Sequence, residues 1–385
     1  MIRITIPQAG FSELPVYLNG DIRQTYIRRG EGDYLVSEEE LKMLIRNGSP
    51  KSNDRIPMKD LTIDDLDKPT LAMFRQLVEA RYPDGAYEDM KMQDFLLHLG
   101  LFDDSDKSRI CPYAGTLLLF GKYNTIKRYY DSYQIDYFDY RGSADRWSDR
   151  IATDDLGPQE MNVFNFYSIV YQKLVSTSKA AFRLDENMVR INTDIREALR
   201  EALVNTIIHA DYSIPNGSIR IEVYDTYYRF ENPGKMLIPT DVFFRGGTTK
   251  PRNDVVMSAF RRIGLSERQG YGGYQIFLTV SNIRLRSPQI ETSLEKTVLT
   301  IWLVDLPGSY PELGNAEKDV LSCLTHSSLL SKDDIESMLS DRYSEYRIKK
   351  KLDWYYPLQL IIHAFEVIFS STASASSIFS LGSSV

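Results

Sequence analysis

The sequence predicts a mixed α/β (α+β) protein, because helix-like and strand-like patterns of apolar residues alternate along most of the chain. The clearest helical pattern covers residues 194–210, where apolar side chains recur every three to four positions. Residues 133–140 and 218–224 instead alternate apolar with polar side chains, as half-buried strands do. The chain has 385 residues, of which 43% are hydrophobic and 26% charged, so it can form two or three globular domains.

The composition excludes several classes of protein. The formal net charge is -7, so a polyanionic partner must be bound by a local basic patch. Two cysteines, Cys111 and Cys323, cannot form a disulfide framework or a cysteine-rich zinc site. The four histidines form no His-x-x-x-His pair, so nothing supports a zinc hydrolase. The sequence has no signal segment and no uncharged apolar run of about 18–20 residues, so we expect a soluble, cytoplasmic protein.

A short N-terminal part, residues 1–48, precedes a polar linker at 49–60. Its Asn19-Gly20 dipeptide is typical of a hairpin turn, and Ser37 with Glu40 is typical of a helix start. The strands expected in this part are 2–6, 16–18 and 25–28.

The next region, residues 61–190, is expected to contain both helices and strands. Helices are predicted within 61–110 and over 159–175, whereas the apolar run 115–120 is most simply a buried strand. Further along the chain, the sequence predicts strands at 228–231 and 296–303 and a helix at 255–263.

The helix predicted at 194–210 has two different faces, because residues four apart lie on the same side of a helix. One side is apolar and is formed by Ile195, Leu199, Leu203 and Ile207. The opposite side carries a carboxylate, an amide and an imidazole in line, in Glu201, Asn205 and His209, after Glu197. A solvated polar face is the common interpretation of such a pattern.

The downstream sequence favours a ligand instead. Three glycine turns follow the helix: Asn232-Pro233-Gly234, Gly246-Gly247-Thr248-Thr249 and Gly270-x-Gly272-Gly273. Each frees the backbone to approach a ligand closely. Between Arg245 and Gln275, six basic residues stand against two acidic ones, a local excess of positive charge that suits phosphate groups.

These motifs resemble a known family. Leu199–Tyr212, LREALVNTIIHADY, is similar to the signature of the RecG-related helicase family that has a histidine-kinase-type (GHKL-like) ATPase domain. The other motifs follow the same order as in that family: the stretches 112–122 and 135–141, residues 218–224 and the glycine turns. Residues 16–46 resemble the end of a Schlafen AlbA-type domain. The resemblance implies a GHKL-like α/β sandwich with a mixed sheet over 191–306, preceded by a partial AlbA-type domain.

The resemblance also implies roles for individual residues. Glu201 would be the general base that activates water, and Asn205 would coordinate Mg²⁺ carrying ATP. His209 would contact phosphate or make a structural hydrogen bond. Lys250 and Arg252 would belong to a mobile lid. The other nucleotide-binding residues would be Asn232, Gly234, Gly246, Gly247, Thr248, Asn253, Gly270, Gly272 and Gly273.

The chain departs from the family pattern at several positions. Asn232 stands where an Asp would accept from the adenine amino group, Met236 stands where a second Gly is usual, and Ala210 replaces an Arg. A scaffold that keeps the fold without using nucleotide therefore remains an alternative. The acidic residues with which some Schlafen-type domains cut RNA would lie upstream, so no nuclease is expected.

The C-terminal segment, 316–357, suggests a winged helix-turn-helix with helices at 316–324, 330–339 and 343–352, after a linker at 307–315. From Asp341 to Leu352, five basic residues stand against two acidic ones. DNA would be bound by the third helix, through Arg347, Lys349, Lys350 and Lys351. An ordinary solvated basic helix is an equal interpretation of these residues, and the Ser/Ala-rich end, 358–385, does not resemble a wing.

The sequence thus predicts a DNA-associated regulatory protein that binds ATP and Mg²⁺, forms a homodimer and makes no membrane contact. Hydrolysis, if any, would be slow. A helicase motor is excluded, because the chain contains no Gly-x-x-x-x-Gly-Lys-Ser/Thr loop.

Overall fold

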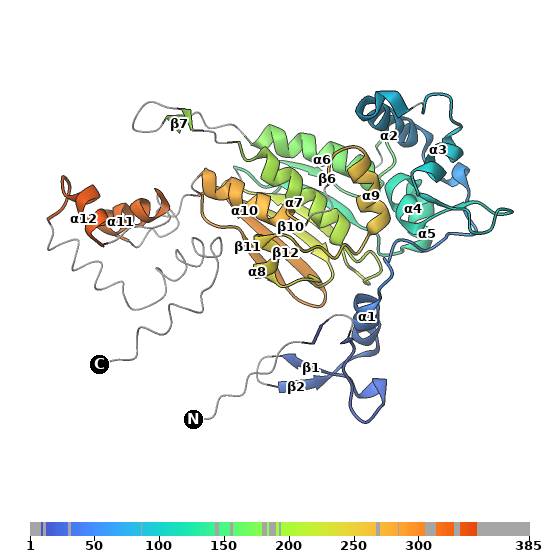
Figure 1. Cartoon of the computed structure of the whole chain (residues 1–385), viewed down its shortest axis with the longest axis horizontal. Coiled ribbons are helices and arrows are strands. Elements are labelled where there is room, and N and C mark those ends of the chain that lie inside the picture. The colour runs from blue at the N-terminus through green and yellow to red at the C-terminus, as the bar shows by residue number, and fades with distance from the viewer. Residues whose placement is uncertain are drawn as a thin grey trace.

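A mixed sheet of six strands forms the centre of the fold (Figure 1). Its strands lie in the order β11-β12-β10-β9-β5-β6; β5 and β9 run parallel, and the other neighbours are antiparallel. The strands are β5 (Ile135–Asp139), β6 (Asp149–Ile151), β9 (Ile219–Val223), β10 (Tyr227–Pro233), β11 (Gln289–Thr292) and β12 (Lys296–Trp302). The fold is therefore mixed α/β, as the sequence predicts.

This arrangement comes from a computed structural model. It describes residues 9–10, 13–29, 32–85, 87–142, 146–154, 157–178, 183–184, 190–191, 194–266, 270–283, 285–304, 313–326 and 332–344.

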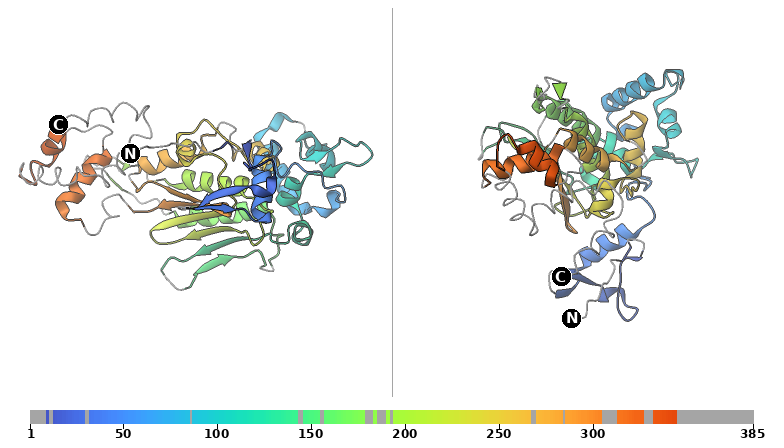
Figure 2. Two further views of the ribbon diagram at one scale, coloured as in Figure 1. Left: turned by 90° about the horizontal axis from the view of Figure 1, so that it is seen from below. Right: turned by 60° about the vertical axis from the view of Figure 1, so that its left-hand side comes forward.

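The sheet is covered by helices on one side (Figure 2). The covering helices include α6 (Val163–Thr177), α7 (Arg196–His209) and α10 (Gly272–Asn282). Leu199, Leu203 and Ile207 of α7 are fully buried, which confirms that the apolar side of this helix faces the core. Alternation in β9 buries Ile219, Ile221 and Val223 beneath the same helices.

A helical region packs beside the sheet. It contains α2 (Lys68–Arg81), α3 (Met92–His98), α4 (Ala114–Phe120), α5 (Tyr123–Tyr129) and the short strands β3 (Phe102–Asp103) and β4 (Cys111–Pro112). A cluster of aromatic rings joins it to α6, with Phe74 centred 5.7 Å from Phe164 and 4.9 Å from Phe120. One hydrophobic cluster runs from Leu61 to Ile301, so the strands and helices on both sides of residue 190 share a core.

The prediction of a strand at 115–120 is wrong, because these residues belong to helix α4. Every residue of α4 is buried, so the run has no polar face that could reveal a helical period. Gly115 lets the helix approach Val255, since a Cβ there would lie 2.7 Å from the Val255 Cβ.

The N-terminal part forms a hairpin and a helix. Asn19 and Gly20 both have positive φ, and Tyr17 pairs with Thr25 across them, but the regular strands are β1 (Tyr26–Arg29) and β2 (Gly32–Leu35). Helix α1 (Glu38–Gly48) begins with the expected capping box. The amide of Glu40 donates to the Ser37 hydroxyl, and the Glu40 carboxylate accepts from the Ser37 amide at 2.8 Å.

Two helices are described near the C-terminus, α11 (Asn315–His326) and α12 (Lys332–Leu339). They match the first two helices that the sequence predicts there, and Cys323, Ile335 and Leu339 form a small core between them. The third helix is predicted over 343–352, and from residue 345 onward it lies outside the described residues, together with Arg347, Lys349, Lys350 and Lys351. So do the expected strand 2–6 and the segment 358–385. Across the described helices, none combines the length and apolar character that crossing a membrane requires.

Candidate functional site

The polar face of α7 meets the third glycine turn. A Cβ on Gly272, the first residue of α10, would lie 2.8 Å from Glu201 Oε2 and 2.9 Å from Asn205 Nδ2. The Glu201 side chain is 16% exposed and pairs with Arg200 at 3.2 Å. The Asn205 Nδ2 donates to the Glu201 carbonyl at 2.7 Å. The structure thus brings together Glu201, Asn205 and Gly272, which the sequence assigns to one site.

The loops before α10 pack closely on one another. Gly246 ends α8 (Thr240–Arg245) with φ 75°, and a Cβ there would lie 2.6 Å from the Tyr271 ring. Gly270 has φ 67° and lies against the backbone of Thr248, where a Cβ would come within 2.6 Å. Gly247, at φ 85°, and Gly273, against Phe243, complete this group of predicted residues. At Gly270 and Gly273 the neighbouring backbone approaches too closely for a side chain.

A second group of predicted residues gathers at the C-terminal end of α7, around Arg252. The guanidinium of Arg252 is buried and donates to the carbonyl of His209, to the Lys235 carbonyl at 2.9 Å and to the Asn47 Oδ1 at 2.9 Å. Burial lowers the pKa of Arg252 to about 10, and the buried carboxylate of Asp211 opposes this shift. In this structure Arg252 ties three segments together, whereas a mobile lid would leave its charge free for a phosphate.

Asn253, next to Arg252, also binds the C-terminal end of α7. Its Nδ2 donates to the carbonyls of Ile208, at 3.1 Å, and Ala210, at 2.7 Å, so it satisfies carbonyls that the helix end leaves without partners. His209 is the last residue of α7 and is partly buried. Burial, with a further effect from the Arg252 charge, lowers the pKa of His209 to about 4. The imidazole is therefore neutral at physiological pH.

The first glycine turn lies beside Arg252. Gly234 has φ 98°, and a Cβ there would lie 3.0 Å from both the Arg252 Nη1 and the Asp211 Cβ. Asn232 is buried at the end of β10, and its Nδ2 donates to the Pro233 carbonyl at 3.2 Å. Lys250 donates to the Asn47 carbonyl at 2.9 Å. Burial lowers the pKa of Lys250, and the charge of Arg252 adds a smaller effect in the same direction.

The N-terminal part supplies residues that the sequence analysis did not find. Arg46 near the end of α1 forms an ion pair with the buried Asp211 at 3.1 Å. Asp54 in the linker is 1% exposed and accepts from the amides of Val255 and Val256, at the start of α9 (Asp254–Arg262). Burial raises the pKa of Asp54, although the hydrogen bonds oppose this. The linker thus packs against the start of α9. In the sequence, the only signal for this role is that Ser52, Asn53 and Asp54 are residue types that cap helices.

The residues around Gly272 fit part of a Mg²⁺–nucleotide site. Mg²⁺ usually keeps several waters and takes one or two protein oxygens together with phosphate oxygens, so the single amide oxygen of Asn205 suffices in chemical terms. Within the described ranges, no group of three or more His, Cys, Asp or Glu lies close enough to hold a metal without phosphate. Gly270, at the turn before α10, has a positive φ, a backbone conformation found in loops that bind anions.

Comparison with known proteins supports an ATPase-like segment. Residues 216–301, from before β9 to β12, match the family "Putative ATP-dependent DNA helicase recG C-terminal". Residues 42–136, from within α1 to the start of β5, match a domain of unknown function, DUF8451. The RecG-related part of the resemblance is therefore supported. Helix α7 lies between the two matched segments.

The fold is similar to that of a solved structure, the DIP2311 protein from Corynebacterium diphtheriae. The TM-score is 0.50 at 18% sequence identity, and the match covers 86% of this chain. This chain spans 56% of the length of that protein. None of the curated proteins matches the chain significantly.

Proposed function

We propose that this chain binds ATP with Mg²⁺ between the polar face of α7 and the glycine turn that starts α10, as the GHKL-like part of a DNA-associated regulatory protein. The observation that carries the proposal is the contact of Gly272 with both Glu201 and Asn205. Gly272 lies 71 positions from Glu201 and 67 positions from Asn205 in the sequence, and the family resemblance implies that these three residues share one site. The match of residues 216–301 to a RecG-type family supports the same proposal.

In this proposal each residue has a defined role. Asn205 offers its amide oxygen to Mg²⁺, and bound Mg²⁺ neutralises charge on the phosphates. Glu201 takes a proton from the attacking water, and hydrolysis is slow because Arg200 engages the same carboxylate. The backbone amides of residues 270–273 hold the phosphate oxygens.

DNA binding and dimer formation are also proposed, from the sequence. The basic residues Arg347 and Lys349–Lys351 would contact DNA phosphates, and α11 with α12 would position them. The DNA affinity would then fall steeply as salt is raised from about 50 to 200 mM.

Thermal melting of the full chain with ATP, ADP and GTP, each with and without Mg²⁺, tests the nucleotide proposal. Saturating Mg-ATP should raise the melting temperature by several degrees, since a ligand that binds only the native state stabilises it. Asn205→Ala should abolish the part of the rise in melting temperature that depends on Mg²⁺. Glu201→Gln should keep ATP binding but stop ATP hydrolysis. Glu197→Gln, an exposed site on the same helix, is the control. Unchanged Mg-ATP affinity in Asn205→Ala would overturn the site.

A scaffold without nucleotide use is the second candidate function. It is favoured by Arg252, whose guanidinium occupies the space beside Gly234, and by the self-contained hydrogen bond of Asn232. The absence of any melting shift with every nucleotide would support this function.

A further inference from the structure

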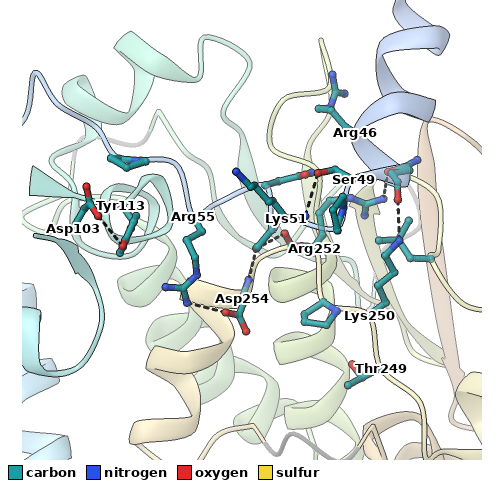
Figure 3. Close-up of a pocket in the computed structure, with 17 residues that line it drawn as sticks. Arg46, Ser49, Lys51, Arg55, Asp103, Tyr113, Thr249, Lys250, Arg252 and Asp254 are labelled. Carbon is teal, nitrogen blue, oxygen red and sulfur yellow. Dashed lines mark hydrogen bonds and ion pairs between the residues drawn. The ribbon is translucent and has the colours of Figure 1, made fainter. Parts of the chain in front are cut away.

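A pocket of about 690 Å³ lies where the linker faces the loop before α9 (Figure 3). Residues 46–57 form one wall, and residues 249–254 form the other. Asp103, Tyr113 and Leu237 complete the lining. Its volume is in the range of small-molecule pockets. Its lining includes none of Glu201, Asn205 and Gly272, so it is separate from the contact of Gly272 with Glu201.

The lining carries an excess of positive charge. Five cationic side chains line the pocket, Arg46, Lys51, Arg55, Lys250 and Arg252. Two carboxylates, Asp103 and Asp254, also line it. The buried Asp54 and Asp211 lie behind the lining, and counting both of them still leaves an excess of one positive charge.

The carboxylates are already engaged. Asp254 pairs with Arg55 at 2.8 Å, Asp211 pairs with Arg46 at 3.1 Å, and Asp103 accepts from the Tyr113 hydroxyl at 3.1 Å. Lys51 is exposed and forms no salt bridge with a residue of the described ranges. Its ammonium therefore has no carboxylate partner within the pocket.

Two buried donors of lining residues also lack acceptors. Within the part of the chain that the structure describes, the Asn53 Nδ2 and the Arg252 Nε have no hydrogen-bond partner. A buried donor without an acceptor costs free energy. An oxyanion in the pocket would supply acceptors for such donors, and it would oppose the lowering of the Lys250 and Arg252 pKa values that burial causes.

We propose that this pocket binds a small phosphate-bearing anion, a di- or polyphosphate group, held between Lys51 and Asn53 of the linker and Lys250 and Arg252 of the loop. Arginine and lysine are the side chains that bind phosphate best. Such a ligand bridges the two walls, so its binding fixes the linker on the loop that leads into α9. The pocket does not require Mg²⁺ or the α7 face, so it stands independently of the proposed nucleotide site.

Calorimetric titration of the full chain with sodium pyrophosphate, in EDTA and at constant ionic strength, tests the proposal. We expect saturable binding at one site per chain. Lys51→Glu should weaken it at least about tenfold, because a charge reversal replaces attraction by repulsion. Lys59→Glu makes the same change at an exposed lysine that does not line the pocket and should change the affinity less than about twofold.

Three results would overturn the proposal. The first is no saturable binding of pyrophosphate. The second is equal weakening by Lys51→Glu and Lys59→Glu, which would show attraction to overall charge. The third is loss of binding in Asn205→Ala, which would place the anion at the α7 face. Conversely, pyrophosphate binding that survives in Asn205→Ala supports the pocket even if Mg-ATP never binds.

Discussion

The carboxylate Oδ2 of Asp54 accepts a hydrogen bond from the backbone amide of Val256 at 2.9 Å, although the two residues are 202 positions apart in sequence. Its Oδ1 accepts from the Val255 amide at 3.2 Å. A residue of the linker therefore caps the helix that follows the basic loop, and the linker is held in the core rather than free in solvent.

Asp54→Ala should lower the free energy of unfolding by about 1–2 kcal/mol, because it removes the cap of α9 and leaves its first amides without acceptors. Asp54→Asn should cost less, since its amide oxygen still accepts. Urea denaturation measures the difference. Asp64→Ala, at an exposed carboxylate with 79% of its side chain accessible, should change stability by less than about 0.5 kcal/mol. Equal effects of the two alanine variants would contradict the capping role.

Arg252→Met should destabilise the protein by about 2–4 kcal/mol, because the carbonyls of His209 and Lys235 lose a charged donor inside the protein. Arg245→Met is the matched control, since Arg245 is 56% exposed and, among the residues that the structure describes, forms its ion pair with Asp241 of the same helix. Denaturation midpoints of the two variants give the comparison. If both variants were as stable as wild type, the hydrogen bonds of Arg252 would not stabilise the fold.

Gly270→Ala should lower the free energy of unfolding more than Gly272→Ala. At Gly270 the φ of 67° is unfavourable for alanine, and its Cβ would collide with the Thr248 backbone, which cannot move aside. At Gly272 the nearest atoms are the ends of the Glu201 and Asn205 side chains, which can rotate. We expect Gly270→Ala to cost at least about 1 kcal/mol more. Gly272→Ala should instead reduce Mg-ATP affinity, with melting temperature and nucleotide titration as the two readouts.

The stability of the protein should fall as the pH is lowered from about 6.5 to 4. The folded-state pKa of His209 is about 4 against an ordinary value of 6.5, so the unfolded chain binds the proton first in this range. The contribution of His209 is thus present above pH 6.5 and is lost as the pH falls to 4. His209→Gln should show a smaller loss between pH 7 and pH 4.5 in urea denaturation. An identical loss in the variant would show that other groups cause it.

Much of the fold could be predicted because its main elements are amphipathic. In α7 the buried Leu199 and Leu203 alternate with polar residues at helical spacing, and in β9 the spacing of Ile219 and Ile221 is that of a strand. Helix α4 failed this test, since a fully buried segment has no polar face. The contact of α7 with Gly272 agrees with the proximity that the family resemblance implies.

The second group around Arg252 could not be predicted from the sequence. The partners of Arg252 come from α1, α7 and the turn after β10, and no local spacing relates them. A basic residue in a glycine-rich loop has the same sequence pattern whether or not its side chain also binds backbone carbonyls. Only the three-dimensional contacts show that the Arg252 guanidinium donates to protein carbonyls.

The parallel pairing of β5 with β9 has a consequence for how this protein can evolve. Because β5 precedes residue 190 and β9 follows it, the segment that matches the RecG-type family includes one half of a strand pair. A gene duplication or fusion that copied only residues 216–301 would leave the β9 edge bare, and bare edges invite aggregation. A fragment that keeps this strand pair must therefore include at least residues 135–302, so that both halves of the sheet are transferred together.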